Sequence, residues 1–376
     1  MRHHFARRYI SFFIYFLGLL SVILSTSCKD SIDQTETDWD IVQVNIPVPL
    51  IGDLHNDGIE RSYAIEDGDL CEYVYQQQRW IKNVLIADAF TSSELHLITN
   101  CRAGQKYCLY GCDENGIFEV QYTEDSWMKS TICTLSDKDE FDWCMVAQSA
   151  VDNEPATTLF IFYWTSGMGK LCELKYQGET WLLNTITDTL TSWAPSPYGM
   201  AAGNVGRNSG PSVFFITGKS CLIECFQDID FNWNIEIVET MMEICRDCVV
   251  SPWCNLNVFP SGDGQSSLFV NCDGLYQYNY QNDQWYKTKA GHPIGNQISG
   301  GYGRNDGIYR LYCYGWFGRI AEFTCSGGIC SQNGLLEIEP ANALNALVVG
   351  PGRGDGVHRL YVEQFNGSIL ELTYKR

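Results

Sequence analysis

The phrase GRNDGIYRLY at residues 303–312 decides the fold, because close copies of it occur twice more in the chain. GDLHNDGIERSY lies at residues 52–63, and GRGDGVHRLY lies at residues 352–361. Self-similarity at a regular period is the sequence signature of a repeat architecture. A shorter phrase follows each copy at a similar distance: CEYVY at 71–75, AEFT at 321–324 and LELTY at 370–374.

A tryptophan is the third landmark of each repeat. It follows a polar turn and opens a stretch of alternating apolar and polar residues. These tryptophans recur about every 50 residues, which together with the alternation and the turn signals is typical of a four-stranded propeller blade. In the sixth unit Cys330 lies where the tryptophan is expected. With the weaker copies of the loop phrase in register, the chain has seven units. The tryptophans are Trp80, Trp127, Trp181, Trp233 and Trp285.

The two ends of the chain complete each other. The last unit stops at residues 372–376, before any tryptophan strand, while an orphan tryptophan strand lies at residues 37–46. We therefore predict an all-β, seven-bladed β-propeller of four-stranded blades over residues 37–376, with the ring closed by the N-terminal strand. Closure also hides sheet edges that would otherwise pair with other chains. A solenoid is the alternative, but it would not need a split final unit.

The N-terminus has the layout of an export signal. Basic residues precede an apolar stretch at residues 9–24, and LSTSC ends at Cys28. This segment resembles a bacterial lipoprotein signal, in which the cysteine carries the lipid, although the leucine lies four rather than three residues before it. We predict a signal peptide at residues 1–27, lipidation of Cys28 and an acidic tether at residues 28–36. A plain signal peptide and an uncleaved anchor are the alternatives.

Cysteine content and charge agree with export. The chain has 17 cysteines, and setting Cys28 aside leaves an even number for disulfides, which belong in an oxidising compartment. Cys325 and Cys330 flank a Ser-Gly-Gly turn and are predicted to form a disulfide. Loss of residues 1–27 shifts the net charge from −20 to −23. Nucleic acid and anionic lipid are therefore poor partners. We expect a monomer on the bacterial cell surface, outer membrane or periplasm, with the lipid anchor as its only membrane contact.

The Gly/Asp loop resembles the calcium loops of FG-GAP and VCBS-type propellers. In those families oxygen ligands stand at loop positions that correspond here to Asp53, His55, Asp57 and Arg61, so the final ligand position holds a cation. Calcium is held by several hard oxygen atoms, so a cation there argues for lost metal sites. Calcium at Asp53 and Asp57 stays as the alternative, and no other cofactor is expected. The predicted substitutes are ion pairs within the loops: Asp57 with Arg61, Asp306 with Arg310, and Asp355 with Arg359.

No catalytic motif is evident in the sequence. Histidines are scattered, and the chain has no G-x-S-x-G, no H-E-x-x-H and no phosphate-binding glycine loop. We therefore predict a non-catalytic binding protein for a glycan or a protein partner. A polysaccharide lyase or hydrolase with a central-channel site, and a purely structural envelope protein, are the alternatives. Clustered aromatic residues at 276–286 and 302–317 suit either sugar stacking or blade cores, and no ligand-binding residue is assigned.

Overall fold

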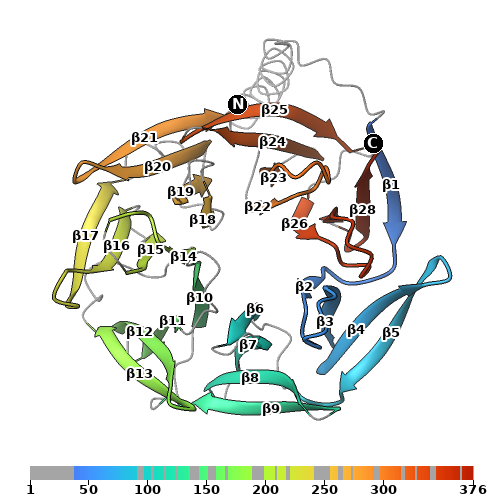
Figure 1. Ribbon diagram of the computed structural model, residues 1–376, viewed down its shortest axis with the longest axis horizontal. Coiled ribbons are helices and arrows are strands. Elements are labelled where there is room, and N and C mark those ends of the chain that lie inside the picture. Colours follow the sequence, from blue (N-terminus) through green and yellow to red (C-terminus); the bar gives the residue numbers. More distant parts are fainter. Residues whose placement is uncertain are drawn as a thin grey trace, which may run out of the picture. The chain divides into compact units, whose positions relative to one another are not determined.

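Seven antiparallel sheets of four strands each surround a central axis in the computed structural model (Figure 1). This confirms the predicted all-β, seven-bladed propeller. The structure describes residues 38–90, 97–102, 106–113, 116–123, 125–135, 144–150, 158–165, 168–188, 199–207, 210–216, 221–240, 255–260, 266–271, 274–291, 297–314, 318–326, 328–338, 344–364 and 366–375.

Blades one to four follow one another along the chain, each with its strands in sequence order. Blade one is β2 (Leu50–Gly52), β3 (Arg61–Glu66), β4 (Asp69–Gln76) and β5 (Arg79–Ile86). Blade two is β6 (Leu97–Arg102), β7 (Lys106–Asp113), β8 (Gly116–Thr123) and β9 (Ser126–Cys133). Blade three is β10 (Cys144–Ala150), β11 (Thr158–Thr165), β12 (Met168–Gln177) and β13 (Thr180–Thr187). Blade four is β14 (Met200–Gly203), β15 (Ser212–Ile216), β16 (Cys221–Gln227) and β17 (Trp233–Thr240).

Blades five and six continue this order, and blade seven takes its outer strand from the N-terminal part of the chain. Blade five is β18 (Asn255–Pro260), β19 (Ser266–Asn271), β20 (Leu275–Gln281) and β21 (Gln284–Gly291). Blade six is β22 (Gln297–Gly301), β23 (Arg310–Tyr314), β24 (Arg319–Ser326) and β25 (Ile329–Glu337). Blade seven is β26 (Leu344–Gly350), β27 (Arg359–Gln364), β28 (Ile369–Tyr374) and β1 (Trp39–Val44).

The N-terminal strand closes the ring, as the orphan tryptophan strand predicted. β1 runs antiparallel to β28, with six residue pairs from Trp39 opposite Tyr374 to Val44 opposite Ile369. Trp39 is buried against the core of blade seven. Figure 1 shows β1 at the rim beside β28, close to the C-terminus.

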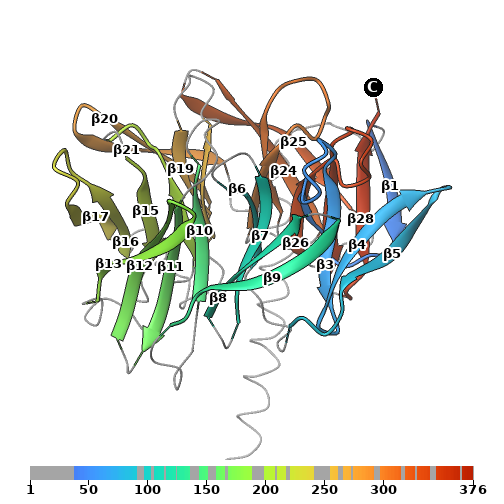
Figure 2. The same ribbon diagram turned by 60° about the horizontal axis from the view of Figure 1, so that its bottom comes forward.

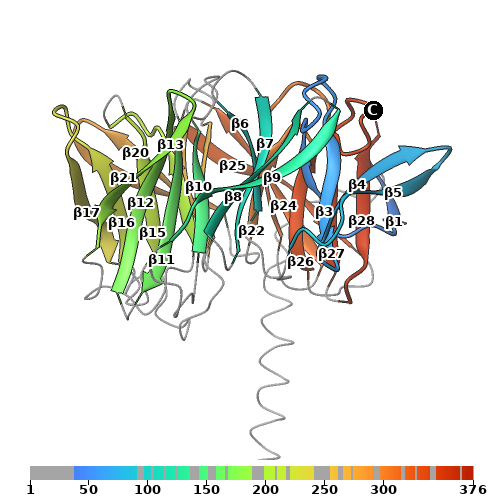
Figure 3. The same cartoon turned by 90° about the horizontal axis from the view of Figure 1, so that it is seen from below.

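The strands of a blade run between the two faces of the ring (Figures 2 and 3). The first strand of each blade lies nearest the axis and the fourth lies at the rim (Figure 1). Two inner strands also pair with each other, since β10 and β14 form a short parallel ladder between blades three and four. In each blade, the loop between the first and second strands joins the strand nearest the axis to the next strand outward.

The hydrophobic core consists of seven clusters, each lying between two neighbouring blades. The outer-strand tryptophans supply part of this packing. Trp80 in blade one packs edge-on against Tyr361 in blade seven, and Trp127 in blade two packs against Tyr63 in blade one. Because each cluster needs two blades, a single blade has no complete core of its own, and the ring is stabilised as a whole.

A repeated contact ties two of the three Gly/Asp loops to the next blade. Asn56 and Asn305 have φ angles of 57° and 56°, in the left-handed region that asparagine tolerates. The Asn305 side chain donates to the His358 carbonyl at 2.9 Å and accepts from the His358 N–H at 2.7 Å. Asn56 makes the same two contacts with Tyr107. In blade seven Gly354 has this position, and its left-handed φ of 73° suits glycine.

The predicted leader, the lipidation site Cys28 and the tether at 28–36 lie outside the described residues. Within the described ranges, no helix has the length and apolar character that crossing a bilayer requires.

Candidate functional site

A buried polar side chain occupies the same place on the third strand of every blade. In six blades it is a glutamate with at most 8% of its surface exposed, and in blade five it is Gln277. The sequence showed this glutamate inside each shorter repeat phrase, but residue type alone did not separate it from a surface acid. The six glutamates are Glu72, Glu119, Glu173, Glu224, Glu322 and Glu371.

A cationic or imidazole side chain reaches four of these glutamates from the loop between the first and second strands. Arg304 Nε donates to Glu322 at 2.7 Å, and Arg353 Nε donates to Glu371 at 2.9 Å. His55 Nε2 lies 2.8 Å from Glu72, and Arg207 pairs with Glu224. Hydrogen bonds between ions are stronger than those between neutral groups. The pairing therefore offsets the cost of burying each carboxylate.

An aromatic ring of the following blade lies against each of these four side chains. The guanidinium carbon of Arg353 is 3.6 Å from the centre of the Tyr75 ring, and that of Arg304 is 4.6 Å from Tyr374. Arg207 lies 4.8 Å from Tyr280, and the His55 ring lies 4.8 Å from the Tyr122 ring. Each tyrosine also packs on the outer-strand tryptophan of its own blade.

We call these four places the junction sites and name them by their blades. They are the one–two site with His55, the four–five site with Arg207, the six–seven site with Arg304 and the seven–one site with Arg353. Their cationic or imidazole side chains keep between 12% and 22% of their surface exposed. Each site thus places hydrogen-bonding groups and an aromatic ring together between two blades, where the cationic or imidazole side chain is partly exposed to solvent.

The loop ion pairs that the sequence predicts are present in the structure. Arg310 donates to both carboxylate oxygens of Asp306, each at 2.7 Å, and Arg359 donates to both of Asp355, each at 2.8 Å. Arg61 makes the same bidentate contact with Asp57. The hydrogen bonds from Arg310 lower the pKa of Asp306 to about 2.

The same three arginines also approach the buried glutamates. The Nε atom of Arg310 is 3.3 Å from Glu322, and that of Arg359 is 3.6 Å from Glu371. Each glutamate in these blades therefore lies between two cationic or imidazole groups. The six–seven, seven–one and one–two sites therefore each hold a continuous polar network. In each network the loop aspartate pairs with its arginine, that arginine approaches the buried glutamate, and the glutamate also contacts Arg304, Arg353 or His55.

The calcium alternative does not fit this geometry. Both oxygens of Asp53 accept backbone N–H groups, from Asp57 at 3.1 Å and from Gly58 at 2.8 Å. The carboxylate of Asp57 accepts hydrogen bonds from Arg61 and forms an ion pair with it. Among the described residues, no group of three histidine, cysteine or acidic side chains is placed to hold a metal ion. Arg61, Arg310 and Arg359 supply the positive charge in these loops.

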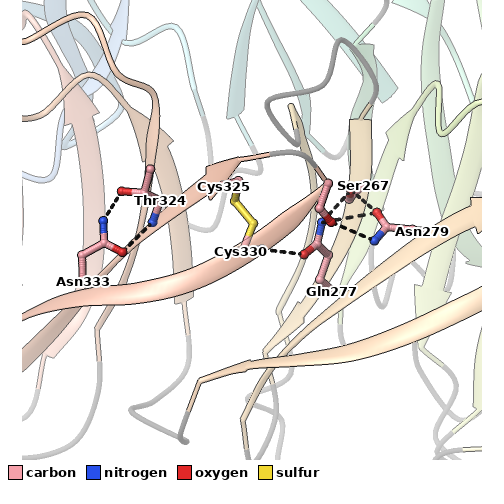
Figure 4. The surroundings of a disulfide bond; sticks show 8 residues. Ser267, Gln277, Asn279, Thr324, Cys325, Cys330 and Asn333 are labelled. Carbon is pink, nitrogen blue, oxygen red and sulfur yellow. Dashed lines mark hydrogen bonds between the residues drawn. A yellow bond between two sulfur atoms is a disulfide. The ribbon is translucent and has the colours of Figure 1, made fainter.

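The junction of blades five and six is built differently (Figure 4). Gln277 donates to the Gly328 carbonyl at 3.0 Å and accepts the Cys330 N–H at 3.1 Å, so it binds the hairpin tip of the next blade. Cys325 and Cys330 are joined by a disulfide across that hairpin, with their Cα atoms 4.0 Å apart. Here the amide of Gln277 takes the place of the glutamate and binds a backbone turn of the next blade.

The aromatic residues that the sequence singled out at 276–286 are divided between two environments. Tyr278 is 1% exposed and donates to Glu239, whereas Tyr280 belongs to the four–five site and Tyr286 is 46% exposed. Trp316 and Phe317 lie outside the described residues. The cluster is therefore not one continuous surface in the described part of the chain.

The inner strands whose side chains the structure describes carry no ionisable acid or base. β2, β14, β18, β22 and β26 have neither an acidic nor a basic residue, and no histidine. Acid–base chemistry needs a positioned group that gives or takes a proton. The residues of these five strands do not supply one.

Comparison with known proteins supports the architecture. No protein-family model matches the chain, and no curated protein sequence matches it. Among solved structures, BBS1N in complex with ARL6DN is similar over 91% of this chain and 98% of its own, with 14% identity and a TM-score of 0.59. The Dos1 propeller is similar over 86% of this chain and 78% of its own, with 10% identity and a TM-score of 0.52. At these identities the likeness shows the propeller fold alone.

Proposed function

We propose that this protein is a non-catalytic binding protein whose ligand is a glycan held at the junction sites. One observation carries the proposal: four times around the ring, a partly exposed arginine or histidine on a buried glutamate lies against a tyrosine ring of the next blade. A repeated site on a repeated scaffold suits a ligand that is itself made of repeated units, because linked sites raise the overall affinity.

The chemistry of a sugar ring matches that combination of groups. A sugar presents C–H groups on its faces and hydroxyl groups at its edges. An aromatic ring offers a flat apolar surface for the former. Guanidinium N–H groups donate to hydroxyl oxygens, and a carboxylate accepts from hydroxyl hydrogens. Each junction site combines these partners at the surface between two blades, and small polar ligands are bound by a few placed polar groups among apolar ones.

The inner strands favour binding over catalysis. The five inner strands noted above lack acidic and basic residues. A lyase or hydrolase site in the channel would need such groups. At the junctions, each buried glutamate is held by hydrogen bonds to its own blade, which suits recognition.

Export and anchoring belong to the same proposal. The basic and apolar leader with Cys28 supports a lipid-anchored location at the bacterial cell surface, the outer membrane or the periplasm. The net charge of the chain after leader removal is strongly negative. A neutral ligand meets no electrostatic repulsion from such a surface, whereas a polyanion does.

A glycan array probed with the folded, oxidised protein tests the proposal. We expect selective binding to a subset of glycans that is the same with and without calcium, because the loops carry arginine in place of the final metal ligand. Heat-unfolded protein on the same array is the control. An array with no selective binding would contradict the glycan proposal and would direct the search to a protein partner through co-purification from the envelope.

A further inference from the structure

The two junction sites that flank blade seven differ from the other two in their charge. At the six–seven site, Arg304 and Arg310 face Asp306 and Glu322. At the seven–one site, Arg353 and Arg359 face Asp355 and Glu371. Two cations and two anions balance at each of these sites, which are therefore formally neutral. They lie side by side around the ring, since blade seven contributes to both (Figure 1).

The other two sites carry excess negative charge. At the four–five site, Arg207 pairs with both Glu224 and Glu236, so one cation faces two carboxylates. At the one–two site, Arg61 faces both Asp57 and Glu72, and Asp53 and Glu60 lie in the same loop. Burial and the charge of Asp53 raise the pKa of Glu60. An anionic ligand is repelled at these sites and gains no net attraction at the two neutral ones.

Both neutral sites keep hydrogen-bonding capacity that the protein does not use. Arg353 binds Glu371 through Nε and Nη2, and Arg304 uses Nε and Nη1. Among the described residues, no acceptor binds Nη1 of Arg353 or Nη2 of Arg304. Each arginine therefore offers N–H donors at a position that keeps 16–17% of the side chain exposed.

A buried tyrosine hydroxyl lies behind each of these arginines. Tyr312 and Tyr361, on the second strands, are at most 1% exposed, and within the described part of the chain their hydroxyls have no hydrogen-bond partner. The residue before each arginine is a glycine. A Cβ added to Gly303 would lie 2.6 Å from the Tyr312 Oη, and one added to Gly352 would lie 2.9 Å from the Tyr361 Oη. Buried hydroxyls are seldom left unpaired in native proteins.

Resting on the glycan function proposed above, we propose that the six–seven and seven–one sites are the primary subsites and that each takes one uncharged, hydroxyl-bearing sugar ring. A hydroxyl group both donates and accepts, so its oxygen can take an N–H from the partly exposed arginine. A neutral ring leaves the charge balance of each site unchanged. Acidic sugars, with a carboxylate that faces Glu322 or Glu371, are disfavoured.

Titration calorimetry on the full oxidised protein tests this inference with two probe panels. One panel holds neutral hexose and deoxyhexose oligosaccharides, and the other holds uronic-acid oligosaccharides of matched length. We expect binding from the neutral panel only. Because a neutral ligand is not screened, its affinity should change less than about twofold between low and high salt.

Ring-removal variants locate the site without leaving a buried charge unpaired. Tyr75→Leu removes the ring at the seven–one site and Tyr374→Leu removes it at the six–seven site, and each should remove one of two binding equivalents. The double variant should therefore lose both equivalents, because neither site keeps a ring for the sugar to contact. Tyr286→Leu, at an exposed ring outside the junction sites, is the matched control and should keep both equivalents. Arg353→Lys keeps the positive charge but loses the bidentate contact with Glu371, and it should weaken binding at the seven–one site.

The outcomes separate the two proposals. A preference for uronic-acid oligosaccharides, or an affinity that falls steeply with salt, would overturn the neutral-ligand inference while glycan binding stands. Wild-type binding by the double variant would overturn the placement at these two sites. No binding from either panel, with a glycan array that is also negative, would overturn the proposed function itself.

Discussion

Arg353 of blade seven lies with its guanidinium carbon 3.6 Å from the centre of the Tyr75 ring in blade one. These residues are at opposite ends of the sequence, and ring closure brings them together. The contact joins the last Gly/Asp loop to the third strand of the first blade, and it repeats between Arg304 and Tyr374 one junction away. The blade junctions are therefore both the core of the fold and the place where charged and aromatic groups meet.

Closure of the ring by β1 predicts a large effect of mutations at Trp39. Trp39 is 9% exposed within the core of blade seven. Trp39→Ala should lower the free energy of unfolding by about 3–5 kcal/mol, as large-to-small changes in a core do. Val42→Ala on the same strand is the control, because Val42 is 50% exposed and its change should cost less than about 0.5 kcal/mol. Chemical denaturation measures both, and equal midpoints would contradict the closure.

The loop arginines should make the protein independent of calcium. Arg310→Ala leaves Asp306 without its cation, while Glu322 keeps Arg304, and we expect a loss of about 1–3 kcal/mol. EDTA should leave the wild-type Tm unchanged. The control is Arg319→Ala, because Arg319 and Glu337 are both about half exposed and such pairs contribute about 0–1 kcal/mol. A marked fall in Tm with EDTA would mean that the loops hold a metal ion after all.

Acid should remove part of the stability through Asp306. Hydrogen bonds from Arg310 lower the folded-state pKa of Asp306 from 3.8 to about 2. A carboxyl group with a depressed folded-state pKa stabilises the protein fully above its unfolded value, and this contribution is lost as the pH falls toward the folded value. The stability difference between wild type and Asp306→Asn should therefore shrink as the pH falls from about 4 to about 2. Urea unfolding across this range measures it, with Asp283→Asn in an exposed turn as the control; a constant difference at every pH would contradict the prediction.

Restoring the common glutamate in blade five should harm the protein. Gln277 donates to the Gly328 carbonyl and to the Ser267 hydroxyl. Gln277→Glu removes that donor and places carboxylate oxygens against acceptors in a buried position. We expect a loss of about 1–3 kcal/mol at neutral pH, the usual cost of leaving buried polar groups unpaired. Thermal unfolding tests this, and a gain in stability would show that the hairpin of Cys325 and Cys330 adapts to a carboxylate.

Lipid attachment at Cys28 predicts a simple change of location. Cys28→Ala should move the protein from the membrane fraction to the soluble fraction of the cell envelope, because the lipid anchor supplies the only membrane contact in the proposal. Metabolic labelling with a fatty-acid analogue should mark the wild type and leave the variant unlabelled. Cys71→Ala, at a buried position in blade one, is the control and should stay with the membrane. Unchanged retention of Cys28→Ala would exclude the lipoprotein assignment.

The fold was predictable because its two decisive signals are local. The Gly/Asp phrase and the tryptophan turn recur in register, and the split final unit requires an N-terminal partner strand. The loop ion pairs were accessible for the same reason, since Asp306 and Arg310 are four residues apart. Trp39 opposite Tyr374 follows directly from closing the ring.

The junction sites were not predictable in the same way. Glu322 lies inside a repeat phrase, but only the structure shows that it is buried and that Arg304 reaches it. The tyrosine at each site comes from the following blade, so no sequence spacing links Arg353 to Tyr75. In blade five the change to Gln277 is intelligible only once the hairpin tip at Gly328 is seen beside it.

The most direct test of the central claim is a crystal structure of the protein with a glycan chosen from the array. The account predicts a sugar ring at the six–seven and seven–one sites, within hydrogen-bond distance of Arg304 and Arg353 and in contact with Tyr374 and Tyr75. A glycan bound in the central channel, or on the outer strands away from these residues, would contradict it.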